Sequence, residues 1–129
     1  MGGELRELGG YTDKNFLLKV HATPLHPHSR LIVKISSSLE KKELIELQNE
    51  ALRKLQASPL ECKSPCLIPT ALQADMVVLA EEGACNYLRV FTYIEGEEME
   101  AIEDPPRHLF DEAGRIAAKL SLLLSQLGR

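Results

Sequence analysis

The stretch Leu31-Ile32-Val33-Lys34-Ile35-Ser36 places one lysine inside an apolar run, and Glu50 follows sixteen positions later. The run has the length and β-branched content of a strand. Residues 37–58 then have helical periodicity, with apolar residues at Leu44, Leu47, Ala51 and Leu55 and with Ile45 and Leu52 widening that stripe. Glu50 lies one position from the stripe, so we expect it to flank the buried face and pair with the strand lysine.

Taken alone, a strand lysine followed by a helix glutamate is more simply interpreted as two exposed side chains that do not contact each other. The apolar neighbours of Lys34 favour the paired arrangement. Ser37 and Glu40 have the spacing of a capping box, which predicts the helix start.

A loop with two adjacent glycines, Gly9 and Gly10, precedes this unit and separates strand-like segments 4–8 and 15–21. The loop has neither the G-x4-G-K-[S/T] spacing of a P-loop nor the G-x-G-x-x-G spacing of protein kinases. A hairpin turn therefore remains the simpler interpretation of the two glycines by themselves.

The other elements predict an α+β fold. Prolines in the 22–29 linker favour an antiparallel hairpin between its flanking strands, and segments 76–80 and 87–94 are strand-like, with Gly83 at the turn between them. We therefore expect a mostly antiparallel sheet of about five strands with one packed helix in residues 1–94.

Residues 95–129 form a second region, predicted as an acidic hinge followed by a helix. Asp104 is the expected N-cap, with Pro105 at the first helical position. The helix has an apolar stripe of Leu109, Ala113, Ile116, Leu120, Leu123 and Leu127. A core helix is the simpler interpretation of this stripe. So wide a stripe also predicts a covering surface, which is either a further lobe or, by self-association through this 109–127 face, another copy of the chain.

Composition excludes several classes of function. The chain has 129 residues, a net charge of −4 and a pI near 5.6, which is not the footprint of a nucleic-acid-binding protein. No apolar run is long enough for a membrane helix. The three cysteines and the lack of a signal peptide predict free thiols and a cytoplasmic location, and the lone C-x3-C pair, with no second pair of ligands, argues against a zinc site.

Five motifs in order resemble the aminoglycoside phosphotransferase and choline kinase-like family. They are the glycine loop Arg6-Glu7-Leu8-Gly9-Gly10-Tyr11-Thr12-Asp13-Lys14-Asn15-Phe16, the lysine strand Val33-Lys34-Ile35-Ser36, the helix Glu46-Leu47-Gln48-Asn49-Glu50-Ala51-Leu52, the strand and hinge Arg89-Val90-Phe91-Thr92-Tyr93-Ile94-Glu95-Gly96, and Gly114-Arg115-Ile116-Ala117-Ala118-Lys119-Leu120. The resemblance implies a protein-kinase-like small lobe, followed by a hinge and the first helix of a large lobe. Within the family, the chain is most similar to members that phosphorylate 5-hydroxylysine with GTP.

The resemblance implies a nucleotide site. Gly10, Tyr11 and Asn15 would cover the phosphates, and Lys34, oriented by Glu50, would contact them. The backbone around Thr92, Tyr93 and Ile94 would meet the base.

The partners implied are GTP or ATP with Mg²⁺ and, in a longer protein, a small amino-alcohol substrate. The family's catalytic loop and its metal-binding aspartate have no counterpart before Arg129, so we assign no catalytic residue and no metal ligand. We therefore expect the 129-residue chain to be an inactive fragment or short isoform, or else a non-catalytic partner-binding module.

Overall fold

A six-stranded antiparallel sheet forms the centre of the protein. The computed structural model describes residues 3–9, 13–21, 29–58 and 62–127. The strands are β1 (Gly3–Leu8), β2 (Lys14–Val20), β3 (Arg30–Ile35), β4 (Leu67–Ile68), β5 (Val77–Glu81) and β6 (Ala84–Thr92). Their order is β1-β2-β3-β6-β4, with β5 also paired to β6, and all pairs are antiparallel. The α+β prediction is confirmed, with the two-residue β4 as an additional strand.

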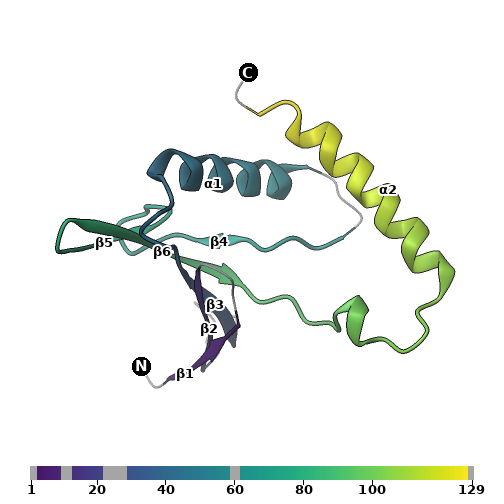
Figure 1. The fold of residues 1–129 in the computed structure, drawn as a ribbon, viewed down its shortest axis with the longest axis horizontal. Coiled ribbons are helices and arrows are strands. Elements are labelled where there is room, and N and C mark those ends of the chain that lie inside the picture. The colour runs from purple at the N-terminus through teal and green to yellow at the C-terminus, as the bar shows by residue number, and fades with distance from the viewer. Residues whose placement is uncertain (1–2, 10–12, 22–28, 59–61, 128–129) are drawn as a thin grey trace.

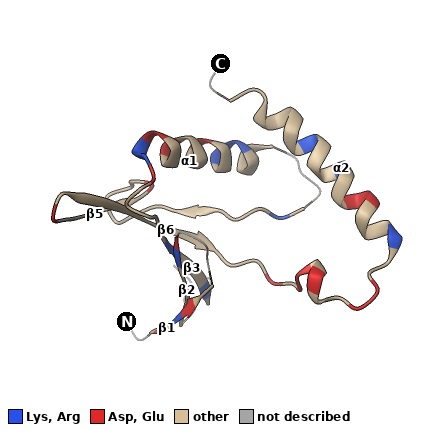
Figure 2. Cartoon of the chain, viewed as in Figure 1, with Lys and Arg blue, Asp and Glu red and all other residues tan. Residues whose placement is uncertain are grey.

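Two helices accompany the sheet. Helix α1 (Lys42–Ala57) lies across one side of the sheet (Figure 1). Helix α2 (Arg107–Leu124) lies off the sheet and approaches α1, at the end of an extended segment that contains the 3₁₀ turn η1 (Met99–Ala101). Acidic residues are frequent along that segment (Figure 2). Neither helix of the described residues has the length and hydropathy needed to cross a membrane.

The turn between β5 and β6 has the predicted position. Glu82 and Gly83 both have positive φ, at 45° and 81°. Two central residues with positive φ give the tight turn whose twist suits a two-residue hairpin. The turn sets the pairing of β5 with β6, in which Val77 lies opposite Leu88.

Both predicted helix caps are wrong. Helix α1 begins at Lys42 after Lys41, which makes no side-chain cap, while Ser37 Oγ accepts from the Leu39 amide at 3.2 Å. The Ser37 amide donates to Asp13 Oδ1 at 3.2 Å, so a contact with the start of β2 holds this segment as a turn. Helix α2 begins at Arg107 after Pro106, with no side-chain cap.

The buried face of α1 differs from the predicted stripe. Ile45 and Asn49 are its buried residues, at 0% and 1% exposure, whereas Leu44 and Leu47 are 48% and 45% exposed. One helical position corresponds to a rotation of about 100°. The helix is therefore turned by about one residue from the orientation that the leucine spacing predicts.

Ile45 should be the main apolar anchor of α1 on the sheet. We expect Ile45→Ala to lower the free energy of unfolding by about 2–4 kcal/mol, because it leaves a cavity at a fully buried position. Leu44→Ala, one residue earlier on the same helix, should cost about 1 kcal/mol or less. Urea denaturation of both variants checks this, and equal losses would contradict the observed rotation of the helix.

Candidate functional site

A cleft of about 580 Å³ lies between the sheet and α1. It brings together five of the eight residues predicted to contact a nucleotide, namely Asn15, Lys34, Thr92, Tyr93 and Ile94. Gly10 and Tyr11 lie outside the described residues. Glu50 lines a different cavity, together with Asp75. The structure thus gathers strand and hinge residues that are far apart in sequence, and their contact with a nucleotide stays a prediction.

Strand register explains why these residues share one cleft. Lys34 on β3 lies opposite Asn15 on β2 and opposite Arg89 on β6. Side chains directly opposite each other on neighbouring strands point to the same face of a sheet. A polar row of Asn15, Lys34 and Arg89 therefore crosses the sheet at one level.

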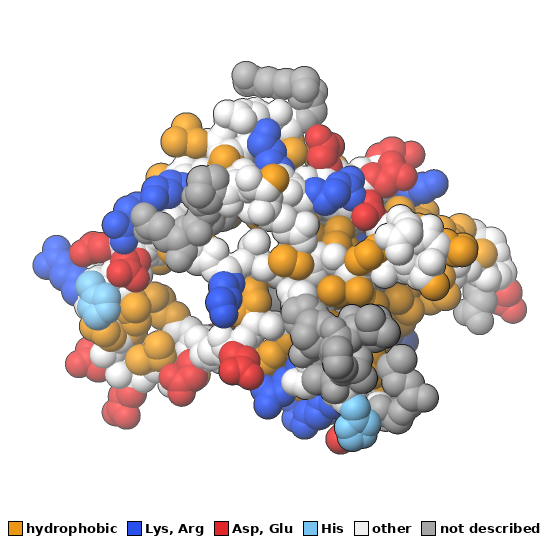
Figure 3. All heavy atoms as spheres, turned by 180° about the vertical axis from the view of Figure 1, so that it is seen from behind, with side chains coloured by type: hydrophobic (Ala, Val, Ile, Leu, Met, Phe, Trp, Pro, Cys, Tyr) orange, Lys and Arg blue, Asp and Glu red, His pale blue; other side chains and the backbone are white. Residues whose placement is uncertain are grey.

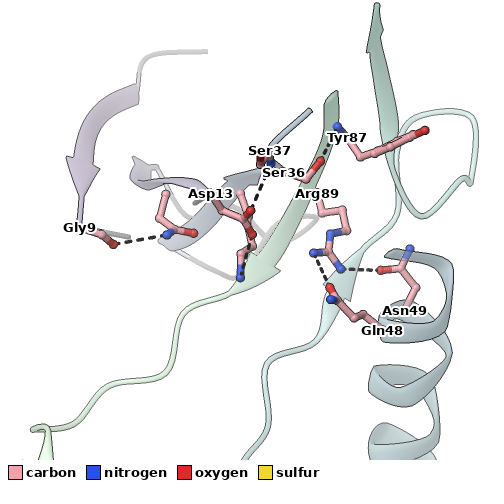
Figure 4. A network of polar contacts seen from close by, with 10 residues as sticks. Gly9, Asp13, Ser36, Ser37, Gln48, Asn49, Tyr87 and Arg89 are labelled. Carbon is pink, nitrogen blue, oxygen red and sulfur yellow. Dashed lines mark hydrogen bonds and ion pairs between the residues drawn. The ribbon is translucent and has the colours of Figure 1, made fainter. Parts of the chain in front are cut away.

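The carboxylate beside Lys34 comes from the end of the glycine loop. Lys34 Nζ lies 3.6 Å from Asp13 Oδ2, and the side chains are 35% and 13% exposed. Asp13 is itself held by the Ser37 amide (Figure 4). The ion pair links the start of β2, the lysine strand and the turn before α1.

The predicted pairing of Lys34 with Glu50 is wrong. Glu50 is exposed, and no ion pair within 4 Å joins it to Lys34 in the described ranges. Asn49 occupies the buried position, and Glu50 follows it about 100° further around the helix axis. The glutamate therefore faces away from the lysine strand.

Helix α1 instead contacts the sheet through Arg89. The Arg89 Nη1 donates to Asn49 Oδ1 at 2.9 Å, and Nη2 donates to Gln48 Oε1 at 3.0 Å (Figure 4). The guanidinium also lies 5.2 Å from the centre of the Phe91 ring. Arg89 is 2% exposed, and burial lowers the pKa of its guanidinium, while the charges of Asp13 and Glu40 oppose that shift. A cation is thus held beneath the cleft by two uncharged amides.

Thr92, at the end of β6, connects this side of the cleft to Cys66 through two hydrogen bonds. Its amide donates to the Cys66 carbonyl at 2.9 Å, and its hydroxyl accepts from the Cys66 amide at 2.9 Å. Arg30 lies 5.6 Å from the ring of Tyr93 and 3.4 Å from Glu95. These contacts hold the strand end where the chain leaves the sheet.

The sequence analysis missed Arg89, Gln48, Asn49 and Asp13 as site residues. The sequence did carry a signal for Arg89. Every second residue of a strand lies on the same face, so Arg89 shares a face of β6 with the aromatic residues Tyr87 and Phe91. Nothing local marks Asn49, whose polar side chain sits at a buried helix position.

The described residues do not offer a metal site. Within ranges 3–9, 13–21, 29–58 and 62–127, no group of three or more His, Cys, Asp or Glu side chains is arranged to hold a metal ion. The site residues therefore supply positive charge and amide groups, and no carboxylate cluster.

The fold is that of a kinase-like small lobe. The chain is similar to a solved structure of a microcompartment-associated aminopropanol kinase, with a TM-score of 0.69 and 18% sequence identity. The similarity covers 93% of this chain and 35% of that kinase, so the chain spans about a third of its length. At this identity the comparison shows the fold alone. No protein-family model matches the chain, and no curated protein matches its sequence.

The Asn49 contact should be the more costly of the two amide contacts to lose. We expect Asn49→Ala to lower the free energy of unfolding by about 2–3 kcal/mol, because it leaves a buried charged donor without its acceptor. Gln48→Ala should cost about 1 kcal/mol, since Gln48 is an exposed residue and water can reach that side of the guanidinium. Chemical denaturation measures both losses. An Asn49→Ala variant as stable as the wild type would show that the contact contributes little.

Proposed function

We propose that the chain is the nucleotide-binding part of a small-molecule kinase, with residues 1–94 forming the lobe and residues 95–129 leading out of it. The observation that carries the proposal is the cleft in which Lys34 and Arg89 stand side by side at one end of an apolar lining. The kinase-like fold supports it. Family resemblance in the glycine loop and the lysine strand supports it further.

The cleft residues fit a nucleoside phosphate. Ile32, Ala51, Leu52 and Ile94 offer apolar surface for a base, and the Lys34 end offers positive charge for phosphates. The Thr92 amide is engaged with Cys66, so backbone contacts to a base would fall to Tyr93 and Ile94. Among the described residues, no group of three or more His, Cys, Asp or Glu side chains is arranged to hold the Mg²⁺ that such a nucleotide carries.

Phosphoryl transfer depends on positioning and on charge stabilisation of the phosphate oxygens. This chain would contribute to both the positioning of the phosphates and the stabilisation of their charge. Lys34, held by Asp13, would place one positive charge against the polyphosphate. The asparagine Asn15, on the neighbouring strand, would add a donor at the same level.

We propose an amino alcohol as the acceptor, and GTP-dependent phosphorylation of the side-chain hydroxyl of 5-hydroxylysine as the particular reaction of the whole protein. The support is the family resemblance and the similarity to an aminopropanol kinase, whose named acceptor is also an amino alcohol. The choice of GTP over ATP rests on the resemblance alone. Three free cysteines support a reducing compartment such as the cytoplasm.

Lys34→Ala tests the nucleotide site. We expect it to weaken GTP binding by about 10- to 100-fold, the effect of losing one charge-assisted contact to phosphate. Lys42→Ala is the matched control, because Lys42 lies on the exposed side of α1 and pairs with Glu46 outside this cleft. Isothermal titration calorimetry with GTP, ATP and guanosine measures the effect. Equal GTP affinity in the wild type and Lys34→Ala would remove the role given to Lys34.

A second candidate function is a partner-binding module that self-associates through α2. No residue of α2 is buried, and the leucines of the predicted stripe are only half-buried. Hydrophobic side chains also lie open on the rear surface of the molecule (Figure 3). Exposed apolar surface of this kind favours association.

Light scattering after size-exclusion chromatography separates this candidate from the first. Self-association through the predicted 109–127 face gives a mass that rises with concentration and falls to the monomer value in Leu120→Lys, because Leu120 lies on that stripe. If the wild-type chain is monomeric at all concentrations, the chain is not a module that self-associates through α2.

A further inference from the structure

A second cavity, which we call the α1–β5 groove, lies against a different side of α1 from the cleft. It measures about 680 Å³ and is bounded by α1 and by residues 74–78, which lead into β5. Glu50, which does not reach Lys34, lines it. Its wall along α1 extends from Lys42 to Arg53, a length of about 16 Å at 1.5 Å per residue. That length matches about five residues of extended chain.

The charged residues that line the groove are Lys42, Glu43, Glu46, Glu50, Arg53 and Asp75. Two ion pairs, one between Lys42 and Glu46 and the other from Arg53 to the β5 side, neutralise four of these charges. Glu43 and Glu50 join no ion pair within 4 Å in the described part of the chain. Lys54, one turn after Glu50, does not line the groove. Glu43 lies in the first turn of α1, where the helix dipole stabilises a carboxylate, so the charge that has no partner is that of Glu50.

A buried amide forms the floor of the groove. Asn49 is 1% exposed, and its Oδ1 accepts from Arg89, which fixes the orientation of the amide (Figure 4). Its Nδ2 donates to the Met76 Sδ at 4.0 Å, and a thioether sulfur is a weak acceptor. Both residues line the groove. An amide nitrogen carries two hydrogens, so at least one donor at the floor has no acceptor among the described residues.

Exposed apolar side chains and an open strand edge flank this floor. Leu47 and Val78 line the groove and are 45% and 51% exposed. Within the described ranges, β5 pairs with β6 and with no other strand, and residues 77–80 contain neither a charge nor a proline. Natural edge strands usually carry such protection. An unprotected edge offers main-chain hydrogen-bonding groups to an extended segment.

We propose that the α1–β5 groove docks an extended segment of a partner protein in which a lysine or arginine lies next to an apolar residue. The basic side chain would pair with Glu50, and the apolar side chain would lie against Leu47 and Val78. A main-chain carbonyl of the segment would accept from Asn49 Nδ2. Charge complementarity, the length of the groove and the open edge of β5 favour this occupant over a small amine, which would fill only part of the groove.

An NMR titration of the isotope-labelled chain tests this proposal. The probe is a capped peptide in which lysine and leucine alternate over five residues. We expect the largest changes in amide chemical shift at residues 43–53 and 74–78. Glu50→Gln should weaken peptide binding about fivefold, because it removes one partly exposed ion pair. Leu47→Gln should weaken it by a similar factor of about five, because it removes apolar contact.

Two matched control variants should bind the peptide as the wild type does. Leu44→Gln makes the same exchange on the same helix, at a residue that is 48% exposed and does not line the groove. Glu98→Gln removes one carboxylate at an exposed residue outside the groove. The same peptide with glutamate in place of lysine should not bind, since Glu50 would repel it.

Other results would overturn the proposal. Equal losses in the control and groove variants, or shift changes concentrated at the acidic residues 95–104, would mean non-specific attraction. Binding of N-acetyl-lysine amide as tightly as the peptide would make the groove a small-amine site. Groove signals that move with protein concentration in the absence of peptide would make a second copy the occupant. A wild-type chain that shows no shift changes with millimolar peptide would overturn the proposal as well.

The proposal does not depend on the proposed function. GTP binding is measured at Lys34, on a different side of α1, and Glu50→Gln and Leu47→Gln should leave it unchanged. A failure of peptide binding therefore leaves the nucleotide site standing, and a failure of GTP binding leaves the α1–β5 groove standing.

Discussion

A buried arginine must keep hydrogen-bond acceptors around its guanidinium, and this requirement sets how α1 lies on the sheet. Arg89 reaches from the centre of β6 to Asn49 and Gln48, so the helix face that meets the sheet carries amides as well as Ile45. The rotation that satisfies the guanidinium leaves two leucines of the predicted stripe half-exposed. Hydrogen bonding of one buried charge thus outweighs the burial of those leucines.

A Lys34–Glu50 ion pair was predicted both to attach the helix to the sheet and to hold the lysine in place. In the structure, different residues do these two things. The helix is fastened to the sheet by Arg89, and the lysine of the neighbouring strand is held by Asp13. Asp13 stands at the end of the glycine loop and also binds the turn that leads into α1. Asp13, the lysine and the helix are therefore connected through polar contacts that cross the sheet at one level, beneath the cleft.

Strand and helix types were predictable because they depend on local periodicity. The apolar run around Lys34 and the 3.6-residue repeat of the last helix both form as expected. The helix starts were less predictable, since Ser37 is engaged by Asp13, twenty-four residues away. Polar residues at buried positions were the hardest to foresee. The hydrophobicity pattern treats Asn49 as surface, although its side chain is buried with that of Arg89.

Local pattern alone therefore specifies most of the elements of this protein and the antiparallel hairpins between strands that follow one another, because strand alternation, helical spacing and short turns act over a few residues. The choice of side chains that share the cleft belongs to long-range contacts. Strand register places Lys34 beside Arg89, and a bond over forty positions of sequence orients α1. A one-residue rotation of that helix exchanges Glu50 for Asn49 at the sheet, and no local preference is strong enough to set such a rotation.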